Sequence, residues 1–146
     1  MIRCYVMVNA DLRAASDRQI RDLAIFRSLV RNFLHFSEEA AARVGLAPQQ
    51  HQLMLQIAGA PEGTVTTIGY LAEKLYLRHH SAVELSKRCE EAGLIVRRSN
   101  PDDRRQVIVE LTATGNRVLR KLSAEHSREL NELGPHLIKA LTDLVA

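Results

Sequence analysis

Residues 94–111 have the sequence LIVRRSNPDDRRQVIVEL, in which two runs rich in Val and Ile flank a polar turn. β-Branched residues favour strands, whereas Asn, Pro and Asp favour turns, so the segment predicts a β-hairpin. Four arginines surround its turn: Arg97, Arg98, Arg104 and Arg105. This basic hairpin decides the fold class because of the helices that are expected immediately before it.

Two short helices are predicted upstream of the hairpin. Thr66 or Thr67 can cap a helix that runs through Leu75. Another helix is expected over residues 79–92, where Gly93 would end it. Two helices joined by a short turn and followed by a basic hairpin form a winged helix-turn-helix.

Longer amphipathic helices flank this lobe. Residues 16–19 fit a capping box, and apolar residues then recur with helical spacing until Gly45. Such a helix is roughly 40 Å long, too long for so small a domain to cover, so part of its apolar stripe is expected to contact a second subunit. Pro48 suits the first position of a shorter helix. Thr112 can cap a second long helix, which Gly134-Pro135 is expected to break before a terminal segment.

The 146 residues are enough for one domain, and 46% hydrophobic with 25% charged residues is typical of globular proteins. We predict a mainly α fold with a small β-hairpin wing, forming a single domain over residues 1–146. Its winged helix-turn-helix lobe, the DNA-binding part, would span about 48–112. Dimerisation helices would span about 11–45 and 113–146.

Charge alone favours a polyanionic partner only weakly. The net charge is +3, from 20 basic and 17 acidic residues. Between residues 71 and 106 the basic residues outnumber the acidic ones by two, eight against six. The placement of these charges after folding therefore matters more than their total.

The second helix of a helix-turn-helix enters the major groove, where side chains near its N-terminus contact base edges. The candidates are Arg78, His79, His80, Ser81, Val83, Glu84, Lys87 and Arg88. Helical spacing places Ala82, Leu85 and Cys89 on the inner face and Val83 outside, where it could contact a thymine methyl group. An ordinary solvated amphipathic helix explains this segment equally well.

The wing favours the DNA-binding interpretation, because a basic hairpin places cations beside the minor groove. Its candidate contact residues are Arg97, Arg98, Asn100, Asp102, Arg104 and Arg105. Acidic residues within a basic turn are explained if a carboxylate orients a neighbouring guanidinium through a bidentate pair.

From about Asp17 onward the sequence resembles the MarR family of bacterial regulators, most specifically in LAEKL at 71–75, EAGLI at 91–95 and PDDRR at 101–105. The family's Asp-x-Arg-Arg wing signature corresponds to Asp102, Arg104 and Arg105. The resemblance implies that Arg104 reaches the minor groove and that Asp102 holds the wing, so we expect Asp102 to position Arg104. The chain departs from the family at Tyr76, where many members have Gly, and at Arg78-His79, where a Ser or Thr cap is common.

The resemblance further implies a triangular homodimer that binds a pseudo-palindromic operator in double-stranded DNA. It implies a repressor that a small aromatic or phenolic effector releases, from a pocket between the lobe and the dimerisation helices. The lining residues suggested for that pocket are His35, Phe36, His51 and Leu55. The base-contacting residues are the chain's own, so the operator sequence does not carry over.

Other classes of function are less well supported. The chain has no nucleophile-elbow, phosphate-loop or zinc-protease signature, so we expect no enzyme, no metal site and no cofactor. A winged-helix module that binds proteins is the main alternative. Others are a thiol-based redox sensor acting through Cys4 and a DNA binder without a ligand, whereas Cys89 suits a core position. Residues 1–9 do not fit an export signal, and no apolar run suits a membrane span, so we expect a cytoplasmic protein without a membrane partner.

Overall fold

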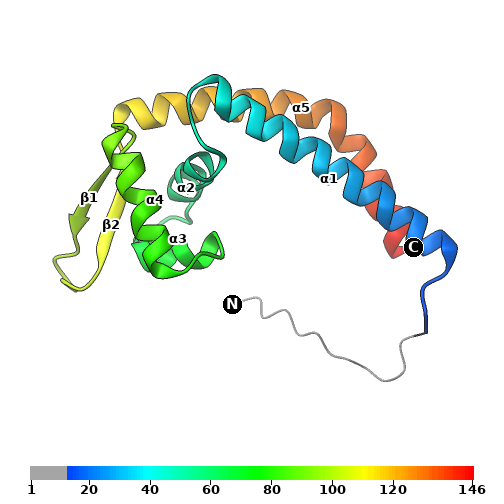
Figure 1. Ribbon diagram of the computed structural model, residues 1–146, viewed down its shortest axis with the longest axis horizontal. Coiled ribbons are helices and arrows are strands. Elements are labelled where there is room, and N and C mark those ends of the chain that lie inside the picture. The colour runs from blue at the N-terminus through cyan, green and yellow to red at the C-terminus, as the bar shows by residue number, and fades with distance from the viewer. Residues whose placement is uncertain (1–12) are drawn as a thin grey trace.

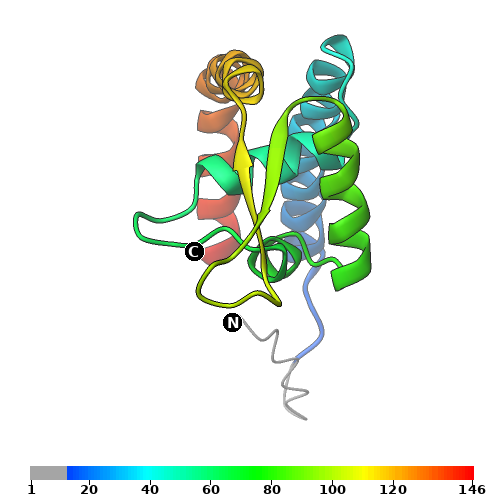
Figure 2. The ribbon, with the colours of Figure 1, turned by 90° about the vertical axis from the view of Figure 1, so that its left-hand side faces the viewer.

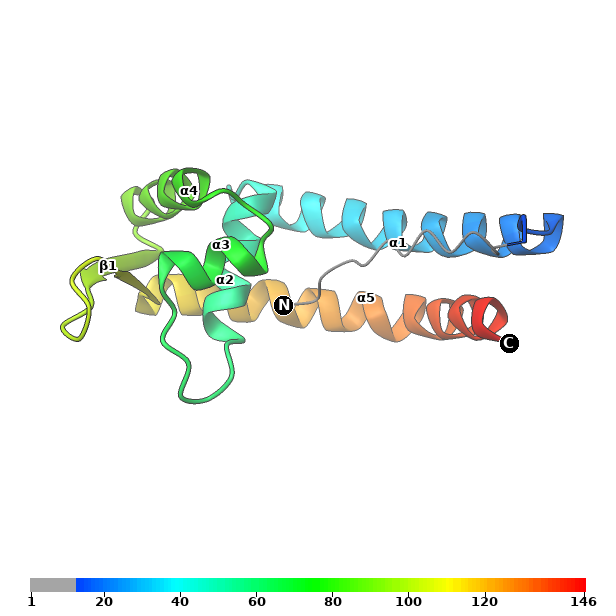
Figure 3. The ribbon, with the colours of Figure 1, turned by 90° about the horizontal axis from the view of Figure 1, so that it is seen from below.

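The computed structural model describes residues 13–146, so Cys4 lies outside the described part. The elements follow in the order α1 (Asp17–Arg43), α2 (Pro48–Ala58), α3 (Ile68–Lys74), α4 (His79–Glu91), β1 (Ile95–Ser99), β2 (Val107–Leu111) and α5 (Ala113–Val145). Elements α2 to β2 form a lobe at one end of the molecule, and α1 and α5 run side by side away from it (Figure 1, Figure 3). The mainly α fold with a two-stranded wing that the sequence predicts is confirmed. No helix among the described residues is long and apolar enough to cross a bilayer.

The predicted helix starts are confirmed. Ser16 and Gln19 form the expected capping box at α1: the Gln19 amide donates to Ser16 Oγ and the Ser16 amide to Gln19 Oε1. Pro48 is the first residue of α2, and the Thr67 hydroxyl accepts the Tyr70 amide at the start of α3. Amides in the first turn of a helix have no backbone partner. The Ser16 and Thr67 side chains each accept one of them, and Pro48 has no amide that needs a partner.

Three helices end in the same way. The second residue after the helix has a positive φ, and the amide of the third donates back to a carbonyl of the last turn, as in a Schellman motif. In α1 and α4 the positive-φ residues are Gly45 and Gly93, whereas in α3 it is Tyr76, at φ 54°. A left-handed conformation costs a residue with a side chain about 1–2 kcal/mol.

The core of the lobe joins both helices of the helix-turn-helix to the wing. Leu53, Leu71, Leu85 and Val109 are among its fully buried side chains and come from α2, α3, α4 and β2. The strands pair in antiparallel register from Ile95 opposite Leu111 to Ser99 opposite Val107. The segment before α3 bonds to the outer edge of β2. The Val109 amide donates to the Thr66 carbonyl, and Thr66 Oγ1 donates to the Val109 carbonyl. The wing is therefore fixed at its base.

α5 differs from the prediction, because the helix continues through Gly134 and Pro135 to Val145. Proline lacks the amide that would bond to the carbonyl four residues earlier, which bends a helix and interrupts it only where nothing else holds it. Here α5 changes direction along its length but remains one helix beside α1 (Figure 1). The expected break before a separate terminal segment is wrong.

Candidate nucleic-acid interface and adjoining cavity

α4 presents a polar face to solvent at one end of the lobe. Ala82, Leu85 and Cys89 are buried as predicted, and burial raises the pKa of the Cys89 thiol to about 11. His79, His80, Glu84, Lys87 and Arg88 are exposed, and Ser81 is half-buried. Arg78 provides no side-chain cap at the start of the helix.

Val83 is less accessible than the sequence predicts. It is half-buried and packs against the core instead of pointing outward, and its carbonyl accepts a 2.7 Å hydrogen bond from Ser86 Oγ. Each helical residue turns by about 100°, so Val83 lies on the flank of the face centred on Ala82. Ser86 lies between Ala82 and Val83 around the helix and is fully buried, although the sequence did not predict it as an inner residue.

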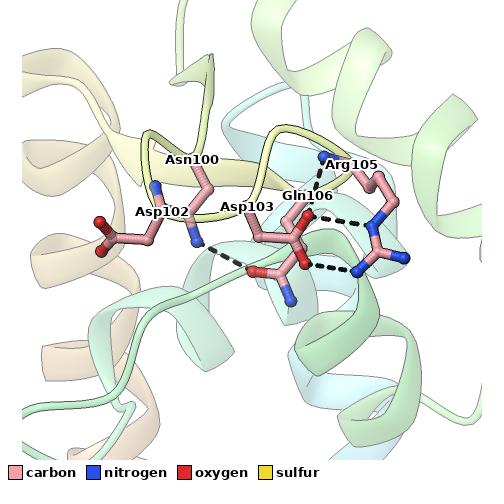
Figure 4. A network of polar contacts seen from close by, with 5 residues as sticks. All are labelled: Asn100, Asp102, Asp103, Arg105 and Gln106. Carbon is pink, nitrogen blue, oxygen red and sulfur yellow. Dashed lines mark hydrogen bonds and ion pairs between the residues drawn. The ribbon is translucent and has the colours of Figure 1, made fainter.

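Asn100 organises the tip of the wing, although the sequence suggested a DNA contact for it. It is buried, its Nδ2 donates to Gln106 Oε1 at 2.9 Å and its Oδ1 accepts the Asp102 amide at 3.0 Å (Figure 4). The backbone closes the same loop, because the Asn100 amide donates to the Gln106 carbonyl and the Gln106 amide to the Asp103 carbonyl. Gln106 was not among the predicted site residues, since its pairing depends on the length of the turn.

A carboxylate does orient a wing arginine, but the pair differs from the expected one. Arg105 Nε donates to Asp103 Oδ1 at 3.1 Å and its terminal nitrogen to Oδ2 at 3.2 Å (Figure 4). The hydrogen bond from Arg105 lowers the pKa of Asp103. The carboxylate of Asp102 points away from this pair and bonds to no described side chain. The expected pairing of Asp102 with Arg104 is therefore absent from the described structure.

The other wing arginines divide into paired and free. Arg98 donates to Glu110 at 2.8 and 3.4 Å, and this bond lowers the pKa of Glu110. Arg97 is half-buried, and its amide donates to Glu90 Oε2 of α4 at 2.9 Å, which ties the wing to that helix. Arg104 is exposed and forms no ion pair with any residue of 13–146. Arg104 is thus the cation that the wing tip leaves open to a ligand.

The first turn of α4 and the tip of the wing lie on the same side of the lobe (Figure 2). His79 and His80 belong to that first turn and Arg104 to that tip, and all three are exposed. A helix end and a basic hairpin exposed together can contact the major groove and the adjacent backbone of one duplex.

A cavity of about 280 Å³ adjoins the lobe between α1, α2 and α5. Its lining consists of Phe33, Leu34, Ser37, His51, Gln52, Leu55, Ser123, His126, Ser127 and Leu130. Two of the four residues suggested from sequence, His51 and Leu55, line it. His35 instead faces Glu39 at 3.2 Å on the surface, and Phe36 lines another hollow with Arg43 and Glu125.

Two histidines dominate the polar part of this cavity. His126 Nδ1 is 2.6 Å from the Leu122 carbonyl, which can only accept, so this nitrogen carries a proton, and Nε2 is within hydrogen-bond distance of Ser37 Oγ at 2.8 Å. The His51 ring lies 5.0 Å from that of His126, and its buried Nδ1 has no partner among the described residues. Burial, and secondly the proximity of His126, lowers the pKa of His51. His51 is therefore neutral at pH 7.

The remaining polar residues do not gather into a metal site. Residues 13–146 contain no cluster of three or more His, Cys, Asp or Glu side chains that could hold an ion.

Comparison with known proteins identifies the fold. The model of the MarR family matches residues 44–106, which include α2 to β1 and the wing tip. No curated protein matches the chain. Among solved structures, AbsC, a MarR family transcriptional regulator from Streptomyces coelicolor, is 21% identical with a TM-score of 0.72, over 88% of this chain and 84% of that one.

Two further structures contain ligands. A mutant of MarR from E. coli complexed with operator DNA is 20% identical with a TM-score of 0.67, covering 90% of this chain and 96% of that one. CouR from Rhodococcus jostii RHA1, bound to p-coumaroyl-CoA, is 22% identical with a TM-score of 0.66, covering 80% and 81%. The fold is therefore that of MarR family structures, as the resemblance implies.

Proposed function

We propose that this chain, which has the fold of MarR family regulators and matches that family's model over residues 44–106, is a sequence-specific regulator of transcription that binds double-stranded DNA. The observation that carries the proposal is the common surface of α4 and the wing, on which Arg104 is free of any described carboxylate. The MarR structure with operator DNA supports this assignment by likeness of fold. The DNA partner implies a protein of the cytoplasm.

In the proposed complex, the first turn of α4 enters the major groove and Arg104 reaches the flanking minor groove. The Asp103–Arg105 pair and the buried Asn100 hold the wing tip before DNA arrives, so less conformational entropy is lost on binding. Lys87 and Arg88 suit phosphate contacts, whereas Arg98 would have to leave Glu110 or share it.

The proposed active form is a homodimer of which α1 and α5 build the interface. Both helices carry large apolar side chains that remain exposed: Ile20, Leu23, Ile25, Leu34, Leu130, Ile138, Leu141 and Val145. A second copy would cover them and place a second α4 about one helical turn, or roughly 10 bp, along a pseudo-palindrome. Repression would follow from covering a promoter.

The cavity between lobe and helices is the proposed effector site, and its chemistry favours a small aromatic or phenolic molecule. Phe33, Leu55 and Leu130 offer an apolar surface, and none of the described lining residues is a Lys or Arg that could balance an anion. His51 Nδ1 is a polar atom in need of a partner, which a phenolic hydroxyl would supply. A molecule wedged there would favour a lobe spacing that no longer fits the operator.

A titration of a labelled random-sequence duplex pool tests the DNA assignment. A DNA-binding regulator should bind the pool at 50 mM salt and lose affinity about 100-fold or more by 200 mM, because phosphate contacts release counterions. The alternative, a winged-helix module that docks onto proteins, predicts no binding at either salt concentration.

The effector assignment needs a separate test with phenol and benzoate as probes. Phenol should raise the melting temperature and weaken DNA binding more than benzoate does at equal concentration. His51→Leu should abolish the effect of phenol while leaving DNA binding intact. Equal responses of the parent and His51→Leu would contradict this site.

A further inference from the structure

The turn between α3 and α4 contains an unusual residue at its most strained position. Tyr76 has a φ of 54°, in the left-handed region that favours glycine. Gly45 and Gly93 occupy the equivalent positions after α1 and α4, where the same hydrogen-bond pattern ends the helix. The chain thus provides its own comparison, because glycine closes two of these three helix ends and tyrosine the third.

The described part of the fold leaves the Tyr76 side chain almost uncovered. It is 88% exposed, and its hydroxyl forms no hydrogen bond with any residue of 13–146. Its amide donates to the Glu73 carbonyl, and the Leu77 amide to the Ala72 carbonyl, but these bonds involve only the backbone. Glycine would make the same cap with less strain, so packing does not explain a tyrosine here.

The position of the turn indicates a use for the side chain. Tyr76 lies two residues before Arg78, the residue that precedes the first turn of α4. The turn faces the same side of the lobe as the tip of the wing (Figure 2). If α4 occupies a major groove, this turn meets the sugar-phosphate backbone at the edge of that groove, and tyrosine hydroxyls are common donors to phosphate oxygens.

We propose that Tyr76 is a DNA-backbone contact residue whose hydroxyl donates a hydrogen bond to a phosphate beside the groove that α4 occupies. This inference rests on the proposed function. The contact fixes the angle at which α4 enters the groove, because the short turn ties the tyrosine backbone to the start of the helix. Tyrosine is neutral, so the contact adds affinity without displacing a counterion.

Two variants separate this role from a structural one, using a duplex that the parent binds. Tyr76→Phe keeps the ring and removes only the hydroxyl, so the melting temperature should stay the same while affinity falls about tenfold or more. Tyr76→Gly relieves the strain, so it should melt a few degrees higher and yet bind at least as weakly as Tyr76→Phe. The slope of log affinity against log salt should be unchanged in both.

Parent-like affinity of both variants would overturn the role of Tyr76 while leaving DNA binding in place. A salt slope that falls by about one unit in Tyr76→Phe would also contradict a neutral contact. If the parent itself binds no duplex, the proposed function fails, which is a different result from a failure at Tyr76 alone.

Discussion

The arginines of the wing differ in whether a carboxylate already holds them. Arg105 is paired with Asp103 and Arg98 with Glu110, whereas the side chains of Arg97 and Arg104 have no described acidic partner and only Arg104 of these two is exposed. A carboxylate that is paired with an arginine competes with phosphate for the same guanidinium, so a free arginine binds phosphate more strongly. Arg104 is therefore expected to contribute most to DNA binding among the wing residues.

Arg104→Ala should weaken DNA binding and reduce the salt slope by about one unit, because one phosphate contact is lost. Fluorescence anisotropy over a range of salt concentrations measures both quantities. Arg18→Ala on α1 removes the same charge far from the lobe and is the matched control. If the two variants bind alike, the wing tip does not contact DNA.

His51 predicts a pH dependence of stability. Burial lowers its pKa below the ordinary 6.5, so the unfolded chain binds a proton more readily than the folded one. This contribution to the free energy of unfolding is fully present above pH 6.5 and is lost as the pH falls below it. Urea unfolding between pH 7.5 and 5.5 should show the loss, and His51→Leu should show a smaller one. An unchanged pH dependence in His51→Leu would contradict the buried neutral ring.

Residue pairings were the part of the site that the sequence predicted least well. A carboxylate–arginine pair in the wing was expected, and one exists, but at Asp103 and Arg105 instead of Asp102 and Arg104. Neighbouring residues in a turn point in different directions, and the turn geometry depends on the Asn100–Gln106 hydrogen bond. Spacing along the chain does not reveal that bond.

At the level of elements, the start of α5 packs closely against the backbone that follows α4. A Cβ at Gly115 would overlap the Leu94 carbonyl, whereas one at Gly134 of the same helix would meet nothing. The Leu94 carbonyl also accepts the Thr112 amide, and Thr112 Oγ1 donates to the Gly93 carbonyl at 2.7 Å. The start of α5 therefore fixes the lobe relative to the long helices.

Alanine at these two glycines should have opposite effects on stability. Gly115→Ala should lower the free energy of unfolding by about 1–3 kcal/mol, because the backbone must move apart. Gly134→Ala should raise it by about 0.5–1 kcal/mol, because alanine favours a helix interior over glycine. Urea denaturation measures both. A Gly115→Ala variant as stable as the parent would show that the contact is not tight.

Helix starts and the hairpin were predictable because their signals are local, as at Ser16, Thr67 and the paired β-branched runs. The errors arose where packing overrides local preference. α5 continues through Gly134-Pro135 because it packs along α1. Val83, on the flank of α4, is close enough to the core to pack against it. Only the assembled fold contains that information.

On the scale of the whole molecule, the long helices extend beyond the lobe that they support (Figure 3). Ile138 is 69% exposed and Ile20 56%, and both lie on these helices. Apolar side chains exposed along paired helices are typical of a surface that another subunit covers. The proposed dimer follows from this pattern.

Ile138→Glu should shift the protein from dimer toward monomer, because it would bury an unpaired charge in the proposed interface. Analytical ultracentrifugation measures the mass. Val65→Glu, at another exposed apolar position but between α2 and α3, should leave the dimer intact. A monomeric parent, or a dimeric Ile138→Glu, would contradict an interface built from α5.

Selection of bound duplexes from a random pool at physiological salt tests the central claim most directly, because it requires both the DNA surface and the dimer. Two copies of α4 related by a two-fold axis should enrich a pseudo-palindrome whose half-sites lie about 10 bp apart. Enrichment of no motif, under conditions where the protein is folded and dimeric, would contradict a sequence-specific regulator.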